Sequence, residues 1–248
     1  MALEKILTHQ RQYIQSLAPA LRDVLPSDRD FLAALRQSRI QPAVIAELKP
    51  KSPSAGHLAA ADYDPALQAQ AYEQGGAAAL SVLTEGAFFG GRLEDLTAAR
   101  QATQCPVLCK DFILDLNQVK WARHAGADAC LLIVAALDQA TLIALKQAVE
   151  SYDMLAVIEV HTSEELARAL EVHPQIILIN NRNLWDLSMH PHTTAALLPL
   201  IPAEIPVISA SGFTTPVDIK ALPPRVNAVL IGTQLMREGD PRLFLSQL

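Results

Sequence analysis

The sequence predicts a single (β/α)8 barrel with an N-terminal helical extension, and three observations lead to this fold class. The chain has 248 residues, about the length of one such barrel. From residue 43 onward, eight short apolar runs alternate with segments of helical pattern. Most of the runs are almost continuously apolar, which is typical of parallel strands covered on both faces. A doubly wound open sheet is the alternative fold, but it usually needs fewer strands.

The eight predicted strands are short and aliphatic, and a helix is predicted after each. The strands span residues 43–48, 78–83, 106–110, 129–134, 154–160, 175–181, 206–211 and 228–232. The helices span residues 65–75, 93–103, 116–125, 138–151, 163–172, 193–200, 214–222 and 240–247. The first helix has the clearest boundaries, because Asp64 and Pro65 favour a helix start and Gly75 favours a helix end.

Residues 1–40 precede the first strand and contain two amphipathic stretches, near residues 3–17 and 28–37. We expect residues 1–40 to form a helical extension packed on the barrel. Residues 41–248 would then form the catalytic barrel domain.

Composition and charge exclude several classes of protein. The net charge is −6 and basic residues are interspersed with acidic ones, so nucleic-acid binding is not expected. No apolar run reaches the roughly 20 residues needed to cross a membrane, and the charged N-terminus does not resemble a signal peptide. Cys105, Cys109 and Cys130 form no CxxC pair, which favours free thiols in a reducing compartment. We therefore expect a cytoplasmic protein.

Polar side chains occur where the strands end, which is where this fold places its chemistry. Glu47 and Lys49 end the first run, Lys110 the third, Glu159 the fifth and Asn180 the sixth. Residues two apart on a strand point to the same side, so Glu47 and Lys49 can both face the barrel mouth. Charged groups are rarely buried unless they are paired or functional. The convergence of these side chains on one mouth predicts a catalytic site.

A second pattern predicts a site for a phosphorylated ligand. The seventh run leads into Ser211 and Gly212, and the eighth leads into Gly232 and Thr233. Glycine lets backbone N–H groups approach an anion, and the loops after the last two strands form the common phosphate site of this fold. The serines of segment 52–56 (SPSAG) could close over the same phosphate.

No metal ion or cofactor is expected. His190 and His192 are the nearest candidates for metal ligands, but no acidic residue follows them at ligand spacing. No GxGxxG motif follows the first strand, which argues against a dinucleotide-binding fold.

Eight segments resemble the indole-3-glycerol phosphate synthase family, and they occur in that family's order. They are IAELKPKSPSAG (45–56), SVLTEGAFFGGRLEDL (81–96), PVLCKDFILDLNQV (106–119), GADACLLI (126–133), IEVHTSEE (158–165), INNRNL (179–184), ISASGF (208–213) and LIGTQLM (230–236). The SPSxG, KDF and NNR motifs are highly specific in combination.

The resemblance implies a carboxy-lyase of tryptophan biosynthesis that needs no cofactor. Its substrate would be the phosphorylated, anthranilate-derived 1-(2-carboxyphenylamino)-1-deoxyribulose 5-phosphate. Ring closure with loss of carbon dioxide and water would give indole-3-glycerol phosphate. The resemblance carries the further expectation of a monomer or weak homodimer.

The resemblance also implies roles for the residues that match its motifs. Lys110 would be the general acid that protonates the ketose-derived carbonyl, and Glu159 would act in acid–base chemistry during loss of the hydroxyl. Lys49 would pair with the substrate carboxylate or assist dehydration, and Glu47 would position Lys49 and the substrate. Asn180 would bind the substrate hydroxyls or the developing charge. The implied substrate-binding residues are Ser52, Ser54, Phe89, Phe112, Leu131 and Arg182, and the phosphate-binding residues are Ser211, Gly212, Gly232 and Thr233.

Ala210 is the position where this chain departs most plainly from the family, which usually has Glu there, while Leu178 and Thr233 replace a usual Gly and a usual Ser. Two alternatives therefore stay open beside the synthase. One is a paralogue that performs a related indole cyclisation with decarboxylation, as in scytonemin-type pigment assembly. The other is a catalytically weakened barrel that binds phosphorylated ligands. A sugar-phosphate isomerase is disfavoured, because no paired Asp or Cys acid–base set is evident.

Overall fold

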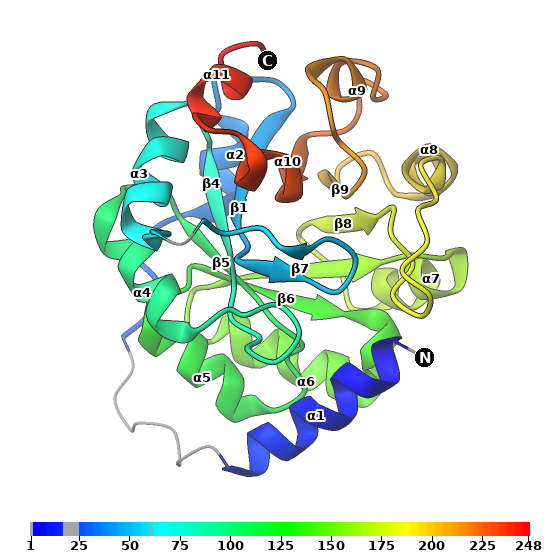
Figure 1. Ribbon diagram of the computed structural model, residues 1–248. Helices are drawn as coiled ribbons and strands as arrows, with labels where there is room; N and C mark the ends of the chain where they lie inside the picture. The colour runs from blue at the N-terminus through cyan, green and yellow to red at the C-terminus, as the bar shows by residue number, and fades with distance from the viewer. Residues whose placement is uncertain (1, 17–24, 61) are drawn as a thin grey trace.

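The computed structural model describes residues 2–16, 25–60 and 62–248, and its centre is a closed barrel of eight parallel strands (Figure 1). The strands follow chain order around the barrel, and β1 pairs with both β4 and β10 to close it. They are β1 (Ala43–Leu48), β4 (Ala79–Leu83), β5 (Val107–Lys110), β6 (Ala129–Ile133), β7 (Leu155–Val160), β8 (Ile177–Asn180), β9 (Val207–Ala210) and β10 (Ala228–Ile231). Each predicted strand is confirmed to within two residues at either end, and the open-sheet alternative is wrong.

The outer layer consists of helices that follow the barrel strands along the chain (Figure 1). They are α3 (Pro65–Gln74), α4 (Leu93–Ala102), α5 (Leu116–Ala125), α6 (Gln139–Glu150), α7 (Ser163–Glu171), α8 (Thr193–Leu197), α9 (Pro216–Lys220) and α11 (Pro241–Leu245). The predicted start of α3 is confirmed, because the Asp64 side chain accepts hydrogen bonds from two backbone amides of its first turn. Helix α9 begins later than predicted, because Thr215 and Asp218 form a capping box at its start.

Several short elements were not predicted from the sequence. After β1, a two-stranded hairpin forms from β2 (Lys51–Ser52) and β3 (Gly56–His57). Single-turn helices η1 (Val134–Ala136) and η2 (Leu198–Leu200) follow β6 and α8. Helix α10 (Thr233–Arg237) follows β10 directly. Such short elements have too few residues for a periodic pattern to appear in the sequence.

The N-terminal extension places its two helices at opposite ends of the barrel. Helix α1 (Ala2–Ser16) lies at the carboxyl ends of the strands, where Gln10 Nε2 donates a hydrogen bond to Asp111 Oδ1 at 2.9 Å. Helix α2 (Phe31–Arg36) lies at the other end, where Arg29, in the turn before the helix, donates a hydrogen bond to the carbonyl of Cys105, which precedes β5. Both predicted amphipathic stretches therefore contain a helix, although residues 28–30 and 37 of the second are not helical. Residue 17 of the first stretch lies outside the described residues, as do residues 1 and 18–24 of the predicted extension.

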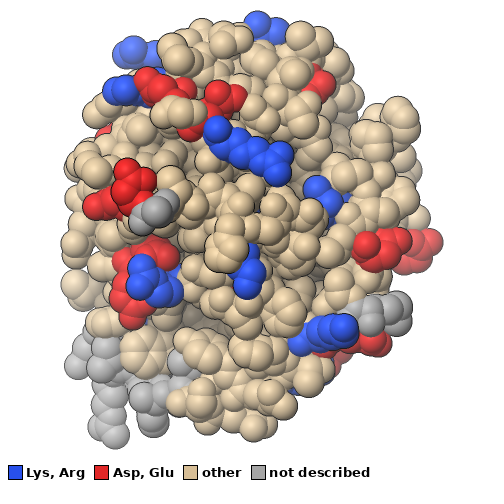
Figure 2. Space-filling model, in the orientation of Figure 1, with Lys and Arg blue, Asp and Glu red and all other residues tan. Residues whose placement is uncertain are grey.

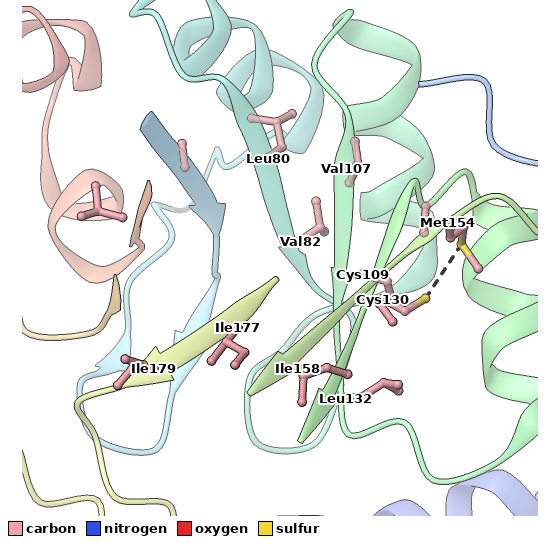
Figure 3. Packing of buried hydrophobic residues seen from close by; sticks show 14 of the residues in the cluster. Leu80, Val82, Val107, Cys109, Cys130, Leu132, Met154, Ile158, Ile177 and Ile179 are labelled. Atoms are coloured by element: carbon pink, nitrogen blue, oxygen red, sulfur yellow. Dashed lines mark hydrogen bonds between the residues drawn. The ribbon is translucent and has the colours of Figure 1, made fainter. Parts of the chain in front are cut away.

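The apolar core has two parts because successive strand residues point to opposite sides. Outward-facing side chains such as Leu80, Val107 and Ile158 pack under the helices (Figure 3). The thiol of Cys130 also faces this layer and lies 3.9 Å from the sulfur of Met154 (Figure 3). Inward-facing residues of every strand form a separate cluster that fills the barrel beneath its mouth. Within the strands, the inward-facing residues are therefore the main source of side chains for a site at the mouth.

The described helices include none that is long and apolar enough to cross a membrane. On the face shown in Figure 2, basic and acidic side chains are scattered among uncharged residues and form no basic stripe.

Candidate active site

A cavity of about 380 Å³ opens at the carboxyl ends of the barrel strands. Every residue that the sequence analysis proposed for catalysis or for substrate and phosphate binding lines this cavity. These residues come from strands β1, β5, β6, β7 and β8, and from the segments after β1, β4, β5, β8, β9 and β10. The fold thus brings together positions that are up to 186 residues apart in the chain, from Glu47 to Thr233.

A buried carboxylate joins two lysines on one side of the cavity. Glu47 and Lys49 are two residues apart and share the inward side of the chain, so their side chains meet with Oε2 and Nζ 2.7 Å apart. The other oxygen of Glu47 lies 3.8 Å from Lys110 Nζ. Burial would raise the pKa of Glu47, but the charges of Lys49 and Lys110 outweigh burial and lower it. Glu47 therefore stays ionised and holds both lysines near the cavity.

Gly232 lies directly against this carboxylate and lysine. A Cβ atom at position 232 would lie 2.1 Å from Glu47 Oε2 and 2.8 Å from Lys49 Nζ. The absence of a side chain is therefore required by the position of the ion pair, in addition to the expected approach of an anion to the backbone.

Glu159 faces the cavity from β7 and is 1% exposed. Its Oε1 accepts a hydrogen bond from Asn180 Nδ2 at 3.1 Å and lies 3.2 Å from His161 Nε2. Burial would raise the pKa of Glu159, but Lys110, His161 and Asn180 together hold it at about 2. The site therefore contains a second ionised carboxylate, on β7, which feels the charge of Lys110.

An apolar wall is formed by Phe89, Phe112 and Leu131. The two phenyl rings pack with their centroids 6.2 Å apart. The loop that carries Phe89 is held by the buried carboxylate of Glu85, which accepts hydrogen bonds from the amides of residues 87–89. This wall can accept a flat aromatic group of a substrate.

The loops after β9 and β10 form the opposite end of the cavity. Ser211 and Gly212 both adopt left-handed backbone conformations, with φ of 70° and 94°. This tight turn follows β9, and Gly232 and Thr233 follow β10 beside it. A backbone of this shape can direct N–H groups toward an anion.

The serine-rich segment after β1 forms the turn of the β2–β3 hairpin. Ser52 Oγ accepts a hydrogen bond from the amide of Ala55 and so stabilises the turn, while Ser54 is exposed beside the cavity. On the far side, Arg182 donates to the carbonyl of Leu187 at 2.8 Å, which fixes its guanidinium at the cavity edge.

Two polar strand-end residues face away from the cavity. Asn181 and Ser209 belong to the outward-facing series and bond to each other and to Thr194 of α8. They tie α8 to the barrel. Arg237 and Leu184 also line the cavity but were not predicted from the sequence. Both lie several residues beyond the end of a strand, where the two-residue period no longer indicates which way a side chain points.

No group of three or more His, Cys, Asp or Glu side chains suited to a metal ion is present among the described residues. The absence of a cofactor stays a prediction.

Comparison with solved structures bears on the fold. N-acetylmannosamine-6-phosphate 2-epimerase from Clostridium perfringens superposes with a TM-score of 0.61 over 87% of this chain and 95% of its own, at 16% identity. Thiamine phosphate pyrophosphorylase from Pyrococcus furiosus gives a TM-score of 0.61 over 83% and 93%, at 14% identity. At these identities the similarity shows the barrel fold alone.

The sequence is also similar to a protein family and to curated proteins along most of its length. The family model described as indole-3-glycerol phosphate synthase matches residues 3–248. The protein of that name from Polaromonas sp. strain JS666 is 48% identical over 89% of this chain and 84% of its own length. Its counterpart from Polaromonas naphthalenivorans is 44% identical over 99% and 97%. The chain therefore belongs to the indole-3-glycerol phosphate synthase family.

Proposed function

We propose that this chain closes the indole ring of 1-(2-carboxyphenylamino)-1-deoxyribulose 5-phosphate and releases indole-3-glycerol phosphate, carbon dioxide and water. The observation that carries the proposal is the arrangement of Lys110, Glu159 and the Glu47–Lys49 pair around one cavity. The cavity has an apolar wall at one side and a glycine-containing turn at another. The family membership supports the same reaction.

The three chemical parts of the substrate match three parts of the cavity. The aromatic ring fits between Phe89, Phe112 and Leu131. The phosphate fits the loops that contain Ser211, Gly212, Gly232 and Thr233, with Ser52 and Ser54 closing over it. The carboxylate can pair with Lys49 or Arg182, both of which line the cavity. The carbonyl carbon then lies between the two ends, where Lys110 and Glu159 are found.

The first step forms a bond between the carboxylated aromatic carbon and the carbonyl carbon. The carbonyl oxygen gains electron density as this bond forms, and Lys110 donates a proton to it as general acid. Loss of carbon dioxide leaves its bonding electrons on the ring and restores aromaticity.

The second step removes the new hydroxyl as water and gives the indole. The hydroxyl must receive a proton and the ring system must lose one, so an acid–base group is needed on the other side of the cavity. Glu159 is ionised, so it can take up the proton that the ring system loses and then pass it to the departing hydroxyl, which leaves as water. Asn180 contacts the same carboxylate and can bind the substrate hydroxyls.

We also propose that the chain works in the cytoplasm as a monomer or weak homodimer. The three cysteines are free and buried, which suits a reducing compartment. Each residue given a role in the proposed reaction is found in this chain.

The test is incubation of the purified chain with the carboxyphenylamino-deoxyribulose phosphate while indole fluorescence is followed. We expect fluorescent product and release of one carbon dioxide for each molecule formed. No product at high enzyme concentration would exclude the reaction.

Ala210 is the observation that favours a second candidate, a paralogue acting on another indole-type substrate. Ala210 is 3% exposed, lines the cavity and pairs in register with Asn180. The glycine-containing turn after β9 favours the phosphorylated substrate over this alternative. A matching substrate that lacks phosphate separates the two, because only a paralogue should convert it efficiently.

A further inference from the structure

His161 is a titratable side chain beside the cavity that the proposed reaction does not use. It follows the end of β7 and lies two residues after Glu159, so both side chains lie on the same side of the chain. Its side chain is 8% exposed and does not line the cavity. His161 therefore lies behind Glu159, within reach of the carboxylate but out of contact with a substrate in the cavity.

The start of α7 fixes one edge of the His161 ring. Thr162 caps the helix by accepting a hydrogen bond from the amide of Glu165. The Glu165 carboxylate reaches back, accepts a hydrogen bond from the backbone amide of His161 at 2.7 Å, and lies 3.0 Å from Nδ1. The same oxygen makes both contacts, so the ring and its backbone are held together.

The opposite edge of the ring meets Glu159. His161 Nε2 lies 3.2 Å from Glu159 Oε1 as an ion-pair contact and makes no hydrogen bond to a described residue, while Asn180 donates a hydrogen bond to that same oxygen. The second oxygen, Oε2, is buried and has no hydrogen-bond partner among the described residues. The two oxygens of Glu159 are thus unequal, since one is held by neighbours and the other has no protein partner.

The charges around the ring favour its protonated form. Burial would lower the pKa of His161, but Glu159 of β7 and Glu165 of α7 outweigh burial and raise it to about 9. Across β8 the neighbouring group is the neutral amide of Asn180, and the charges that act on Glu159 from the cavity side are Lys110 and Glu47. An imidazolium can donate to both carboxylates at once, whereas a neutral ring can donate to only one.

We propose that His161 is a positioning residue, a protonated imidazole between Glu165 and Glu159 that holds Oε1 and leaves Oε2 as the oxygen that exchanges the proton. The proposal rests on the acid–base role proposed for Glu159. It assigns His161 an effect on the ionisation and orientation of that carboxylate, with no contact to the substrate.

The kinetic test compares His161→Asn with the wild-type chain across pH, using the carboxyphenylamino-deoxyribulose phosphate. Removal of the cation should raise the pKa of Glu159, so the acidic limb of the kcat profile should move upward by about one pH unit. We expect kcat at neutral pH to fall roughly 10- to 100-fold because Glu159 loses its fixed orientation. KM should change less than about twofold, because His161 does not line the cavity.

His173→Asn is the matched control. His173 is exposed just beyond the end of α7 and has φ of 50°, a backbone conformation that asparagine adopts readily. Its rate and pH profile should equal those of the wild-type chain. If His161→Asn lowers kcat and leaves the acidic limb in place, His161 only supports the fold and the positioning role is wrong.

A second measurement does not depend on activity and separates failure of this proposal from failure of the proposed function. The ring nitrogens of His161 can be followed by NMR titration of the substrate-free chain. We expect a midpoint near 9 in the wild-type chain and a lower midpoint in Glu165→Gln. A wild-type midpoint at the ordinary histidine value would overturn the proposal, whether or not the chain turns over the substrate.

Discussion

The two ends of the barrel each contain a buried cluster of charged side chains, and the clusters differ in one respect. At the amino ends of the strands, Asp128 is 1% exposed and both of its oxygens have partners. They accept from Ser27 Oγ and the amide of Val107, and they pair with Arg100 and Arg123. At the carboxyl ends, Glu47 and Lys110 border a cavity, and Glu159 retains an oxygen without a protein partner.

The comparison shows that burial of charge alone does not identify an active site. The Asp128 carboxylate, whose two oxygens both have partners, does not line the cavity at the mouth and joins the segment before α2 to β5 and β6. A cluster that borders a cavity and retains an unpaired atom is available for chemistry.

Lys110→Met should lower kcat by roughly 10²- to 10⁴-fold, because it removes the proposed acid. The melting temperature should change little, since Lys110 is 18% exposed and its contact with Glu47 is 3.8 Å long. Lys5→Met, on the exposed side of α1, is the control and should keep full activity. A Lys110→Met variant that retains more than about a tenth of the wild-type rate would exclude Lys110 as the acid.

Asp128→Asn should lower the stability of the fold and leave kcat nearly unchanged, the reverse of Lys110→Met. It leaves Arg100 and Arg123 without their shared carboxylate, and breaking such a buried pair costs about 3–5 kcal/mol of unfolding free energy. Denaturant titration should show this loss, while kcat at low temperature should stay near the wild-type value. Asp153→Asn, exposed and in a left-handed conformation that suits asparagine, should have no effect on stability. A large loss of kcat in folded Asp128→Asn would contradict the division between the two ends.

Gly232→Ala should affect both kinetic constants. The new methyl group must displace the Glu47–Lys49 pair, so kcat should fall about tenfold, and the proposed phosphate loop is disturbed at the same time, so KM should rise. Gly239→Ala is the control, because a Cβ atom at position 239 has no neighbour within 4 Å. An effect on KM alone would mean that the pair moves aside without loss of function.

Ala210→Glu is expected to have the smallest effect. It restores the residue usual in the family at a position that lines the cavity beside Asn180. A true synthase should gain a few-fold in kcat on the phosphorylated substrate, measured by indole fluorescence. A fall in that rate would show that the cavity has adapted to alanine.

The fold could be predicted from the sequence because its strands are apolar runs separated by helices with recognisable caps. The direction of each inward-facing residue also followed from the two-residue period, which placed Glu47 with Lys49 at the mouth. The same period shows that Ser209 and Asn181 face the helices, since each is one residue from an inward-facing neighbour, Ala210 and Asn180.

Other features depend on contacts that sequence distance conceals. Asp111 follows Lys110, and its buried carboxylate accepts from Thr84 at 2.6 Å and from Gln10, 101 residues away. No local pattern predicts these partners. The partners of His161, in contrast, are close in sequence. Its short spacing to Glu159 and Glu165 could have indicated a shared role.

The docking of α1 has a consequence for the order of events during synthesis. The amide of Ala2 donates to the carbonyl of Trp185, and Gln10 donates to Asp111, so the helix contacts residues that leave the ribosome much later. Contacts between such distant residues form slowly because a long loop must first be closed. Helix α1 therefore cannot reach its final place until strands β1 to β8 have been translated, and the mouth of a nascent barrel stays uncovered on that side until then.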